Sequence, residues 1–314
     1  MPKKIKDCWA EKSPNSPGRS APARAGARRA VELLGAPDDR GVLNVGGRLG
    51  ANRGPAAARR ALSQFMLGMD GAVGRVRLGR GFDVAPGLSI EEAHQALREA
   101  VADALRSGVA PLVLGGGHDY GYPHVAGAFD ALGAKIALIN VDAHLDVRPP
   151  EGGLITSGSP FFLALESGVV RPRNFVEFGI QEHCNDAGFG EYIRKKRAKV
   201  VMLNEARAAR GGAVAYFERL VAGFIRKKMR VVVSFDVDSV QMAHAPGVSA
   251  PQADGFTASE FLGMAAVCGE YRGVATIGFF ELAPALDLGG MTARLVATAM
   301  HRYLSALGRQ KVPA

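Results

Sequence analysis

Short runs rich in valine, isoleucine and leucine alternate along this chain with longer stretches rich in alanine and leucine. Of all its sequence features, this alternation restricts the possible folds most strongly. Most of the short runs are continuously apolar, which is typical of parallel strands buried on both faces. Strands separated by helices favour an open α/β sheet with right-handed crossover connections. The eight expected strands are Val42–Val45, Val76–Leu78, Pro111–Leu114, Ile136–Val141, Phe175–Ile180, Val200–Leu203, Val231–Phe235 and Val274–Phe279.

Between these strands the sequence has helical patterns. One of them begins with Ser89 and Glu92, which have the spacing of a capping box. No linker rich in proline and glycine divides the chain after residue 30, so we expect one domain over residues 31–314. The expected helices are Ser89–Arg106, Ala213–Lys228, Thr257–Cys268 and Met291–Leu307.

The first 30 residues differ in composition from the rest of the chain. They contain eight lysines or arginines and two acidic residues, a net charge of +6. The whole chain of 314 residues has a net charge of +9. They are also rich in proline, serine, glycine and alanine, which predicts a disordered basic tail. An organelle transit peptide is an alternative interpretation of this segment. Because Trp9 is its one aromatic residue, we expect no base-stacking platform and no nucleic-acid partner.

Two further features restrict the class of protein. No apolar run approaches the roughly 18–20 residues of a membrane span, so we expect no membrane partner. The three cysteines, Cys8, Cys184 and Cys268, are scattered and form no C-x-x-C pair. This spacing excludes a disulfide scaffold and favours a reducing compartment, for which we expect the cytoplasm.

Groups able to bind a divalent cation follow four of the expected strands. Ligands of open parallel sheets bind at the carboxyl ends of the strands, so these groups are expected to meet at one edge. Residues two apart in an extended chain point to the same side, which would bring the carboxylates and imidazole of D-A-H-L-D together. The four segments are G-G-G-H (Gly115–His118), D-A-H-L-D (Asp142–Asp146), D-V-D (Asp236–Asp238) and Glu281.

Four aspartates in one place require a counter-charge, because like-charge repulsion and desolvation would destabilise each of them by several kcal/mol. Six ligands are too many for one tetrahedral zinc ion, whereas two ions about 3.5–4 Å apart with bridging carboxylates would use them all. A shell dominated by carboxylates favours manganese. The glycines alone could mark a phosphate loop or a tight turn, and single aspartates could cap helices. Neither alternative explains an Asp-x-His-x-Asp pattern.

The motifs resemble those of the ureohydrolase family, which comprises arginases, agmatinases and formimidoylglutamases. The similarity extends from G-R-L-G-A-N-R-G-P (Gly47–Pro55) to T-A-R-L (Thr292–Leu295). It implies a three-layer α/β/α domain around a mostly parallel eight-stranded sheet, with two Mn²⁺ per chain. By this resemblance one ion would be held by His118, Asp142, Asp146 and Asp236. The other would be held by Asp142, His144, Asp236 and Asp238.

The same resemblance implies a reaction. Two cations lower the pKa of a shared water, so that hydroxide is available near neutral pH. Asp146 would accept a hydrogen bond from it and aim it at the carbon of a small-molecule amidine or guanidine. Glu281 would pair with the cationic amidinium, although a carboxylate here could also cap a helix. Relatives form oligomers, so we expect a homo-oligomer.

The substrate is indicated by finer similarities. Arginases and agmatinases have a His-Gly pair after D-A-H-x-D, whereas Ser157–Phe161 here resembles the S-G-T-P-F of formimidoylglutamases. The loop Ala245–Pro251 and the strand end Gly179–Gln181 resemble the same branch. The implied reaction is hydrolysis of N-formimidoyl-L-glutamate to L-glutamate and formamide in histidine degradation. Ser157, His183 and Asn185 are then expected to contact the substrate, with a structural role in the loop as the alternative for His183 and Asn185.

Three departures leave alternatives open. Phe162 stands where that branch has an arginine, and Gly289–Met291 stands where it has D-G-R. Gln241 replaces a third aspartate of arginases. Arg53, Arg148 and Arg294 remain candidates for binding substrate carboxylates. The alternatives are an agmatinase-like or guanidino-acid hydrolase that releases urea, and a catalytically silent relative with a structural role. The complete set of ligands argues against the silent relative.

Overall fold

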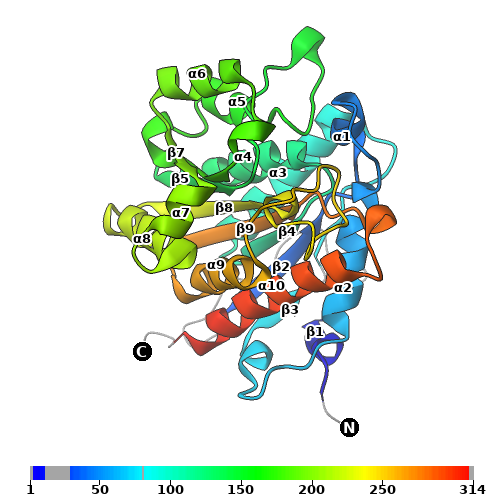
Figure 1. Ribbon diagram of the computed structural model, residues 1–314. Coiled ribbons are helices and arrows are strands. Elements are labelled where there is room, and N and C mark those ends of the chain that lie inside the picture. Colours follow the sequence, from blue (N-terminus) through cyan, green and yellow to red (C-terminus); the bar gives the residue numbers. More distant parts are fainter. Residues whose placement is uncertain (1–2, 11–28, 80, 311–314) are drawn as a thin grey trace.

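The computed structural model describes residues 3–10, 29–79 and 81–310, and in this part of the chain nine parallel strands form one twisted sheet (Figure 1). One edge strand has only two residues, so the main body of the sheet has the expected eight strands. In sheet order the strands are β1 (Trp9–Ala10), β3 (Arg77–Gly79), β2 (Ala30–Gly35), β4 (Ala110–Leu114), β9 (Val274–Phe280), β8 (Arg230–Asp236), β5 (Ile136–Val141), β6 (Phe175–Ile180) and β7 (Lys199–Met202).

Helices cover both faces of this sheet, which confirms the three-layer α/β/α fold (Figure 1). One face carries α3 (Ile90–Arg106), α4 (Gly121–Leu132), α5 (Pro160–Glu166) and α6 (Ala187–Lys196). The other carries α2 (Gly54–Ser63), α7 (Leu203–Ala208), α8 (Gly212–Arg226), α9 (Ala258–Glu270) and α10 (Met291–Arg309). None of the helices in the described residues is long and apolar enough to cross a membrane.

Short 3₁₀ turns connect many of these elements. The turns are η1 (Ile5–Cys8), η2 (Ala51–Arg53), η3 (Ala72–Arg75), η4 (His118–Tyr120), η5 (Glu151–Gly153), η6 (Pro172–Asn174), η7 (Glu182–Cys184), η8 (Val237–Ser239) and η9 (Pro284–Leu286). Two of them lie at the edge where the cation-binding residues were expected: η8 directly follows β8, and η4 follows β4 after three glycines.

The continuously apolar strands are explained by the two cores. In β5, Ile136 and Leu138 pack into the core under α4 and α5, while Ala137 and Ile139 pack into the core on the opposite face. Both sets of side chains are therefore buried, as the continuous pattern predicted.

Helix starts were also correctly predicted from the sequence. The Ser89 side chain accepts a hydrogen bond from the backbone N–H of Glu92, and the Glu92 side chain accepts one from the backbone N–H of Ser89. Thr257 and Glu260 form the same reciprocal capping box at the start of α9. Each cap satisfies N–H groups that the first turn leaves without a partner in the helix.

One expected strand is wrong. Residues 42–45 belong to α1 (Arg40–Asn44) and its C-terminal cap, and the backbone N–H of Leu43 donates to the carbonyl of Asp39. The strand next to β4 is instead β2, which the sequence analysis missed. A four-residue apolar run does not distinguish a buried helical turn from a strand, because its periodicity is too short to read.

The expected disordered tail, residues 1–30, lies largely outside the described residues. Of the described part, Ile5–Cys8 forms η1, and β1 pairs with β3 at the edge of the sheet. The Ile5 side chain is fully buried, and its backbone N–H donates to the carbonyl of Phe65 at 2.9 Å. This short segment therefore packs against α2 and η3.

We expect the Ile5→Ala variant to lower the free energy of unfolding by about 2–5 kcal/mol, because it removes a fully buried side chain from the core. Urea unfolding followed by circular dichroism measures this change. The kcat should not change, since Ile5 is remote from the carboxyl edge of the sheet. A loss below about 0.5 kcal/mol, the range of surface substitutions, would show that this segment does not pack as described.

Candidate metal centre

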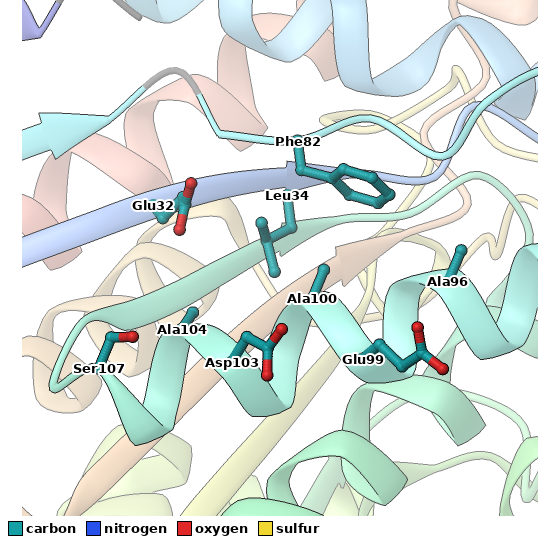
Figure 2. A pocket seen from close by; sticks show the side chains of 9 residues that line it. All are labelled: Glu32, Leu34, Phe82, Ala96, Glu99, Ala100, Asp103, Ala104 and Ser107. Atoms are coloured by element: carbon teal, nitrogen blue, oxygen red, sulfur yellow. The ribbon is translucent and has the colours of Figure 1, made fainter. Parts of the chain in front are cut away.

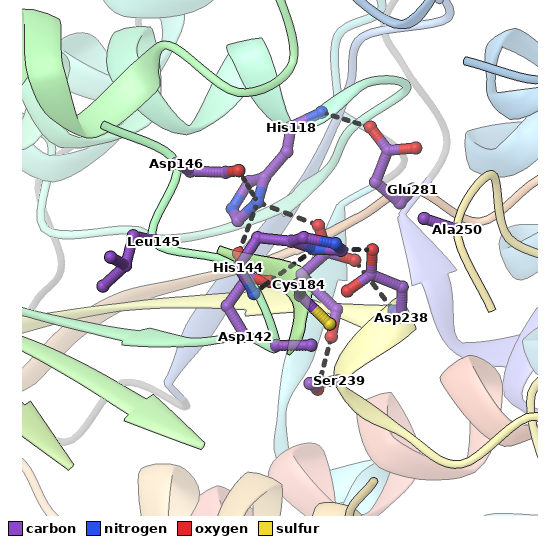
Figure 3. Close-up of polar contacts among 12 residues, drawn as sticks. His118, Asp142, His144, Leu145, Asp146, Cys184, Asp238, Ser239, Ala250 and Glu281 are labelled. Carbon is purple, nitrogen blue, oxygen red and sulfur yellow. Dashed lines mark hydrogen bonds and ion pairs between the residues drawn. The ribbon is translucent and has the colours of Figure 1, made fainter. Parts of the chain in front are cut away.

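A cavity of about 360 Å³ opens at the carboxyl ends of β4, β5, β8 and β9. Its lining brings together the residues that follow four separate strands, which is the convergence predicted from the sequence. Side chains from these strand ends point toward one another in Figure 3. The predicted residues in this lining are His118, His144, Asp146, Ser157, Asp236, Asp238 and Glu281.

Another cavity, of about 370 Å³, lies between α3 and strand β2 (Figure 2). Its lining contains three carboxylates, from Glu32, Glu99 and Asp103, beside apolar groups such as Leu34 and Phe82. It contains no histidine and none of the predicted metal ligands, so it offers no comparable set of ligands.

The first ligand cluster is centred on His118. Its Nδ1 atom lies 3.1 Å from an oxygen of Asp142, 2.9 Å from one of Asp146 and 2.9 Å from one of Asp236. All four ligand atoms lie within 4.8 Å of one another. One nitrogen and three carboxylate oxygens facing a common point suit a divalent cation that prefers oxygen.

The second cluster consists of Asp142, His144 and Asp238. The His144 Nδ1 atom lies 3.5 Å from Asp142 Oδ1 and 3.2 Å from Asp238 Oδ2. Asp142 thus belongs to both clusters and offers one oxygen to each, as a bridging ligand would. Asp236 was also predicted to bridge the two ions. This stays a prediction, because Asp236 belongs to the first cluster and not to the second.

The convergence of these ligands has a different cause from the one expected. The D-A-H-L-D segment bends after β5 instead of continuing as extended chain, and Asp238 lies in η8. The backbone N–H of His144 donates to Asp142 Oδ1, and that of Asp238 donates to Asp236 Oδ1, both at 2.8 Å. Turns closed by the aspartate side chains therefore orient the ligands, and the strand alternation does not.

Three consecutive glycines precede His118 because the backbone there is packed too closely for side chains. A Cβ atom at Gly116 would lie 1.8 Å from the carbonyl oxygen of Asp38, and one at Gly115 would lie 2.1 Å from the ring of Phe280. The glycines thus bring the chain close to its neighbours at the edge of the sheet. Close packing therefore explains the three glycines, and a phosphate-binding loop is not needed to account for them.

Neighbouring polar groups hold the ligands in place. His118 Nε2 forms a 2.8 Å hydrogen bond with Ser234 Oγ, which leaves Nδ1 directed at the carboxylates. Asn140 donates to Asp142 Oδ2 at 3.1 Å and to the buried Glu177 at 2.9 Å. Such contacts fix ring and carboxylate orientation in metal sites.

The carboxylates lack a sufficient counter-charge from the protein. Burial, and then the charges of Asp238 and Asp142, raise the pKa of Asp236 well above its ordinary value. Burial and the charge of Asp142 also raise the pKa of Asp146. Burial raises the pKa of Asp238 to about 6, although His144 opposes the shift. Divalent cations would supply the missing positive charge, and the oxygen-rich donor set fits manganese.

Both residues predicted to be catalytic have left-handed backbone conformations. The φ angle is +48° at Asp146 and +66° at Glu281. Residues other than glycine rarely adopt such φ angles, and the backbone strain costs on the order of 1–3 kcal/mol per residue. Among the described residues only Arg197 and Lys228 share this feature outside glycine. Strain retained at both positions is consistent with a functional constraint on where their carboxylates point.

Glu281 presents an unused carboxylate oxygen to the cavity. Its Oε1 atom accepts a 2.8 Å hydrogen bond from the backbone N–H of His118, whereas Oε2 is buried and has no hydrogen-bond partner among the described residues. Burial, and then the charge of Asp236, raise the pKa of Glu281 well above its ordinary value. The residue thus braces the turn after β4 and offers one oxygen to a cationic ligand.

The three expected substrate contacts have different positions. Ser157 lines the cavity as predicted. Asn185 does not line it, because its amide bonds to backbone groups instead: Oδ1 accepts from the N–H of Leu145, and Nδ2 donates to the carbonyls of Ala143 and Gln181. These bonds give Asn185 a structural role in the loop after β5, which was the alternative interpretation, and its contact with the substrate stays a prediction. His183 also lies outside the lining, and its Nε2 is 3.2 Å from Gln252 Oε1.

We expect Asn185→Ala to lower the affinity for manganese by about 10- to 100-fold, because Asn185 holds the loop that carries His144. Titration of the metal-free protein with Mn²⁺ measures this affinity. At saturating Mn²⁺ the KM for substrate should return close to the wild-type value. A raised KM with unchanged metal affinity would instead support the original assignment of Asn185 as a substrate contact.

Two arginines in the lining complete the site. Arg148 was a candidate from the sequence, whereas Arg48 was missed although it lies within the G-R-L-G motif. The other candidates are elsewhere: Arg53 is exposed outside the lining, and Arg294 lies 5.2 Å over the Phe65 ring at another cavity. Cys184 was also missed as a neighbour of His144, which it lies beside in Figure 3.

A family model described as the arginase family matches residues 29–305. The chain belongs to the arginase family. Among curated members of this family, the formimidoylglutamase of Klebsiella pneumoniae subsp. pneumoniae is 36% identical over 273 residues, which cover 85% of this chain and 82% of that protein. The formimidoylglutamase of Geobacillus kaustophilus is 32% identical over 280 residues, covering 88% and 84%.

Solved structures of the arginase family have the same fold. The formiminoglutamase of Trypanosoma cruzi with Mn²⁺ superposes with a TM-score of 0.83 at 31% identity, covering 92% of this chain and 96% of that one. The proclavaminate amidino hydrolase of Streptomyces clavuligerus superposes with a TM-score of 0.75 at 26% identity, covering 92% and 95%. The resemblance to the ureohydrolases and the predicted fold are therefore confirmed.

Proposed function

We propose that this chain is a manganese-dependent hydrolase that converts N-formimidoyl-L-glutamate and water to L-glutamate and formamide. The observation that carries the proposal is the pair of ligand clusters sharing Asp142, with the unpaired buried oxygen of Glu281 beside them. These contacts suit a reaction in which water attacks a cationic amidine. Relatives named formimidoylglutamase, at 36% and 32% identity over most of the chain, support this substrate.

His118, Asp142, Asp146 and Asp236 would hold one manganese ion, and Asp142, His144, Asp236 and Asp238 the other. When bound, the two ions supply a positive field that neutralises the carboxylates and makes hydroxide available from water near neutral pH. The residues that would hold them are nearly all buried, and the cavity gives water access to the site.

The side chains of this protein direct the remaining steps. Asp146 accepts a hydrogen bond from the attacking water, and its constrained backbone limits where that water lies. Glu281 Oε2 pairs with an N–H of the amidinium and orients the planar carbon toward the nucleophile. Attack makes this carbon tetrahedral, and its C–N bond to the glutamate nitrogen then breaks. That nitrogen leaves as the amine after it gains a proton, and formamide remains.

A guanidine substrate is the second candidate, because the same clusters could position water against a guanidinium carbon. The cavity lining argues for the amidine: Ser157 stands where arginases and agmatinases have a histidine that shuttles protons. Two cationic side chains, Arg48 and Arg148, also line the cavity and oppose the cationic end of agmatine.

The experiment offers N-formimidoyl-L-glutamate, agmatine, arginine and 4-guanidinobutyrate side by side to the manganese-loaded enzyme, and measures formamide and urea. We expect formamide from N-formimidoyl-L-glutamate to be formed fastest. Agmatine should be disfavoured by at least about 100-fold in kcat/KM, because its second cationic group would face Arg48 and Arg148 and leave both without an anionic partner. If urea is released faster from any guanidine, the proposed substrate is wrong, but the proposed metal centre is not affected.

Three further expectations belong to this proposal. The reaction would serve histidine degradation, in which an amidine derivative of glutamate must be hydrolysed. The enzyme would act in the cytoplasm, consistent with the free thiols of Cys184 and Cys268. It would form a homo-oligomer, which sedimentation of the manganese-loaded protein would measure.

A further inference from the structure

The proposed substrate carries two carboxylates, and the metal centre is itself rich in carboxylates. A dianion entering this cavity therefore needs cationic partners in the lining, since unpaired buried charges are strongly unfavourable. The arginines of the formimidoylglutamase branch are missing at both expected places. Phe162 packs against Tyr192 at 5.3 Å between ring centroids, and Met291 begins α10; neither residue lines the cavity.

Arg148 is the first cation in the lining. It follows Asp146 by two residues, and its backbone N–H donates to the carbonyl of Gly158 at 2.8 Å. A Cβ atom at Gly158 would lie 3.4 Å from Arg148 Nε, so the side chain passes closely over the loop that contains Ser157. Its guanidinium carbon lies 5.6 Å from the Phe189 ring centre. No carboxylate of the described residues forms an ion pair with it.

Arg48 is the second cation, and it comes from a different loop. Its Nε donates to the carbonyl of Ser249 at 2.9 Å, and its Nη2 donates to the carbonyl of Val248 at 2.8 Å. These bonds orient the planar guanidinium and leave Nη1 without a hydrogen bond to the described residues. Arg48 also forms no ion pair with them, although Arg40 and Arg59 on neighbouring segments are each paired with an aspartate.

We propose that Arg48 and Arg148 bind the two carboxylates of the substrate, one each, and so select a dicarboxylate. This inference rests on the proposed function and names its specificity-determining residues. Both arginines line the cavity beside the ligand clusters, both are exposed to the entering substrate, and both have donors without a hydrogen bond to the described residues. Arginine suits this role because its donors are arranged in a fixed plane that matches a carboxylate. The pair replaces the arginines that Phe162 and Met291 displace.

The test compares three substrates in the wild type and in the variants Arg48→Met and Arg148→Met. The substrates are N-formimidoyl-L-glutamate, its side-chain amide N-formimidoyl-L-glutamine, and 4-(formimidoylamino)butyrate, which lacks the α-carboxylate. The matched control is Arg60→Met, which removes the same charge from an exposed position on α2 outside the lining. The parameters measured are KM and kcat for each pair of enzyme and substrate, with manganese content verified for every protein.

We expect each variant to raise the KM for the dicarboxylate by about 10- to 100-fold with little change in kcat. One analogue lacks the carboxylate that the substituted arginine would bind. For this analogue the KM should be the same in the variant and in the wild type. Arg60→Met should behave as the wild type does. A merely structural role for the arginines would affect all three substrates equally, and this result would overturn the proposal, as would variants that keep the wild-type preference for the dicarboxylate.

A separate binding measurement distinguishes failure of this inference from failure of the proposed function. Calorimetry with glutarate, a five-carbon dicarboxylate without an amidine, tests the arginines alone in the manganese-loaded protein. Each variant should bind glutarate about 10-fold or more weakly than the wild type. If the wild type hydrolyses no N-formimidoyl-L-glutamate, the proposed function fails. If glutarate binding is the same in all proteins, the arginine pair is wrong whatever the substrate.

Discussion

The Glu281→Gln variant is expected to keep two manganese ions and to lose activity by about 10²- to 10³-fold in kcat. The glutamine oxygen can still accept the hydrogen bond from the His118 backbone, so the turn after β4 should persist. The atom that replaces Oε2 carries hydrogens and no charge, so it cannot pair with a cationic amidinium. The loss should therefore appear in turnover and leave the metal content unchanged.

Elemental analysis after reconstitution, combined with steady-state kinetics, checks this expectation. The control is Glu99→Gln, which makes the same change in the acidic cavity of Figure 2 and should leave kcat unchanged. If Glu281→Gln failed to bind manganese, Glu281 would act through the ligands, and its assignment as the residue that binds the amidinium would be wrong.

The Asp142→Ala variant is expected to lose both manganese ions together. Asp142 is the residue common to the two clusters, with one oxygen in each. Changes to residues that only support ligands reduce metal affinity by 10- to 100-fold, so loss of a bridging ligand should reduce it by at least about 100-fold. Activity should fall to that of the metal-free protein, and the stabilisation of the fold by added Mn²⁺ should disappear.

Comparison with His118→Ala gives this prediction its control, because His118 belongs to one cluster only and its loss should weaken mainly one ion. Mn²⁺ stoichiometry and a Mn²⁺-dependent rise in Tm are the measurements. Asp236→Ala tests the second predicted bridge: loss of both ions would support bridging, and loss of one would restrict Asp236 to the first cluster. Binding of a single zinc ion by the wild type would contradict the binuclear manganese centre.

Much of the fold could be predicted because its signals are local. Continuous apolar runs marked strands such as β5 and β8, since both faces of the sheet are covered and every side chain must be apolar. The capping box at Ser89 marked where α3 begins, and the helical pattern from Thr257 marked α9. Where the apolar run was too short, as at residues 42–45, the sequence predicted a strand, whereas the structure has the end of helix α1 there.

The sequence by itself determined which residues were predicted to form the metal centre, and these residues lie together in the structure. Parallel strands place their carboxyl ends at one edge, so the groups after β4, β5, β8 and β9 were expected there, and the sheet order makes these four strands neighbours. Their chemical types, carboxylates with two imidazoles, then favoured a binuclear manganese site.

Only the tertiary structure decided what surrounds that centre. The position of Arg48 depends on carbonyls from residues 248 and 249, some two hundred positions away, and Asn185 supports a loop forty positions away. Neither contact leaves a pattern in the nearby sequence, because each depends on how distant loops pack. The strained φ angles at Asp146 and Glu281 likewise follow from surroundings that hold the backbone in place. Strand-end ligands follow from topology, whereas the contacts that select a substrate follow from packing between loops.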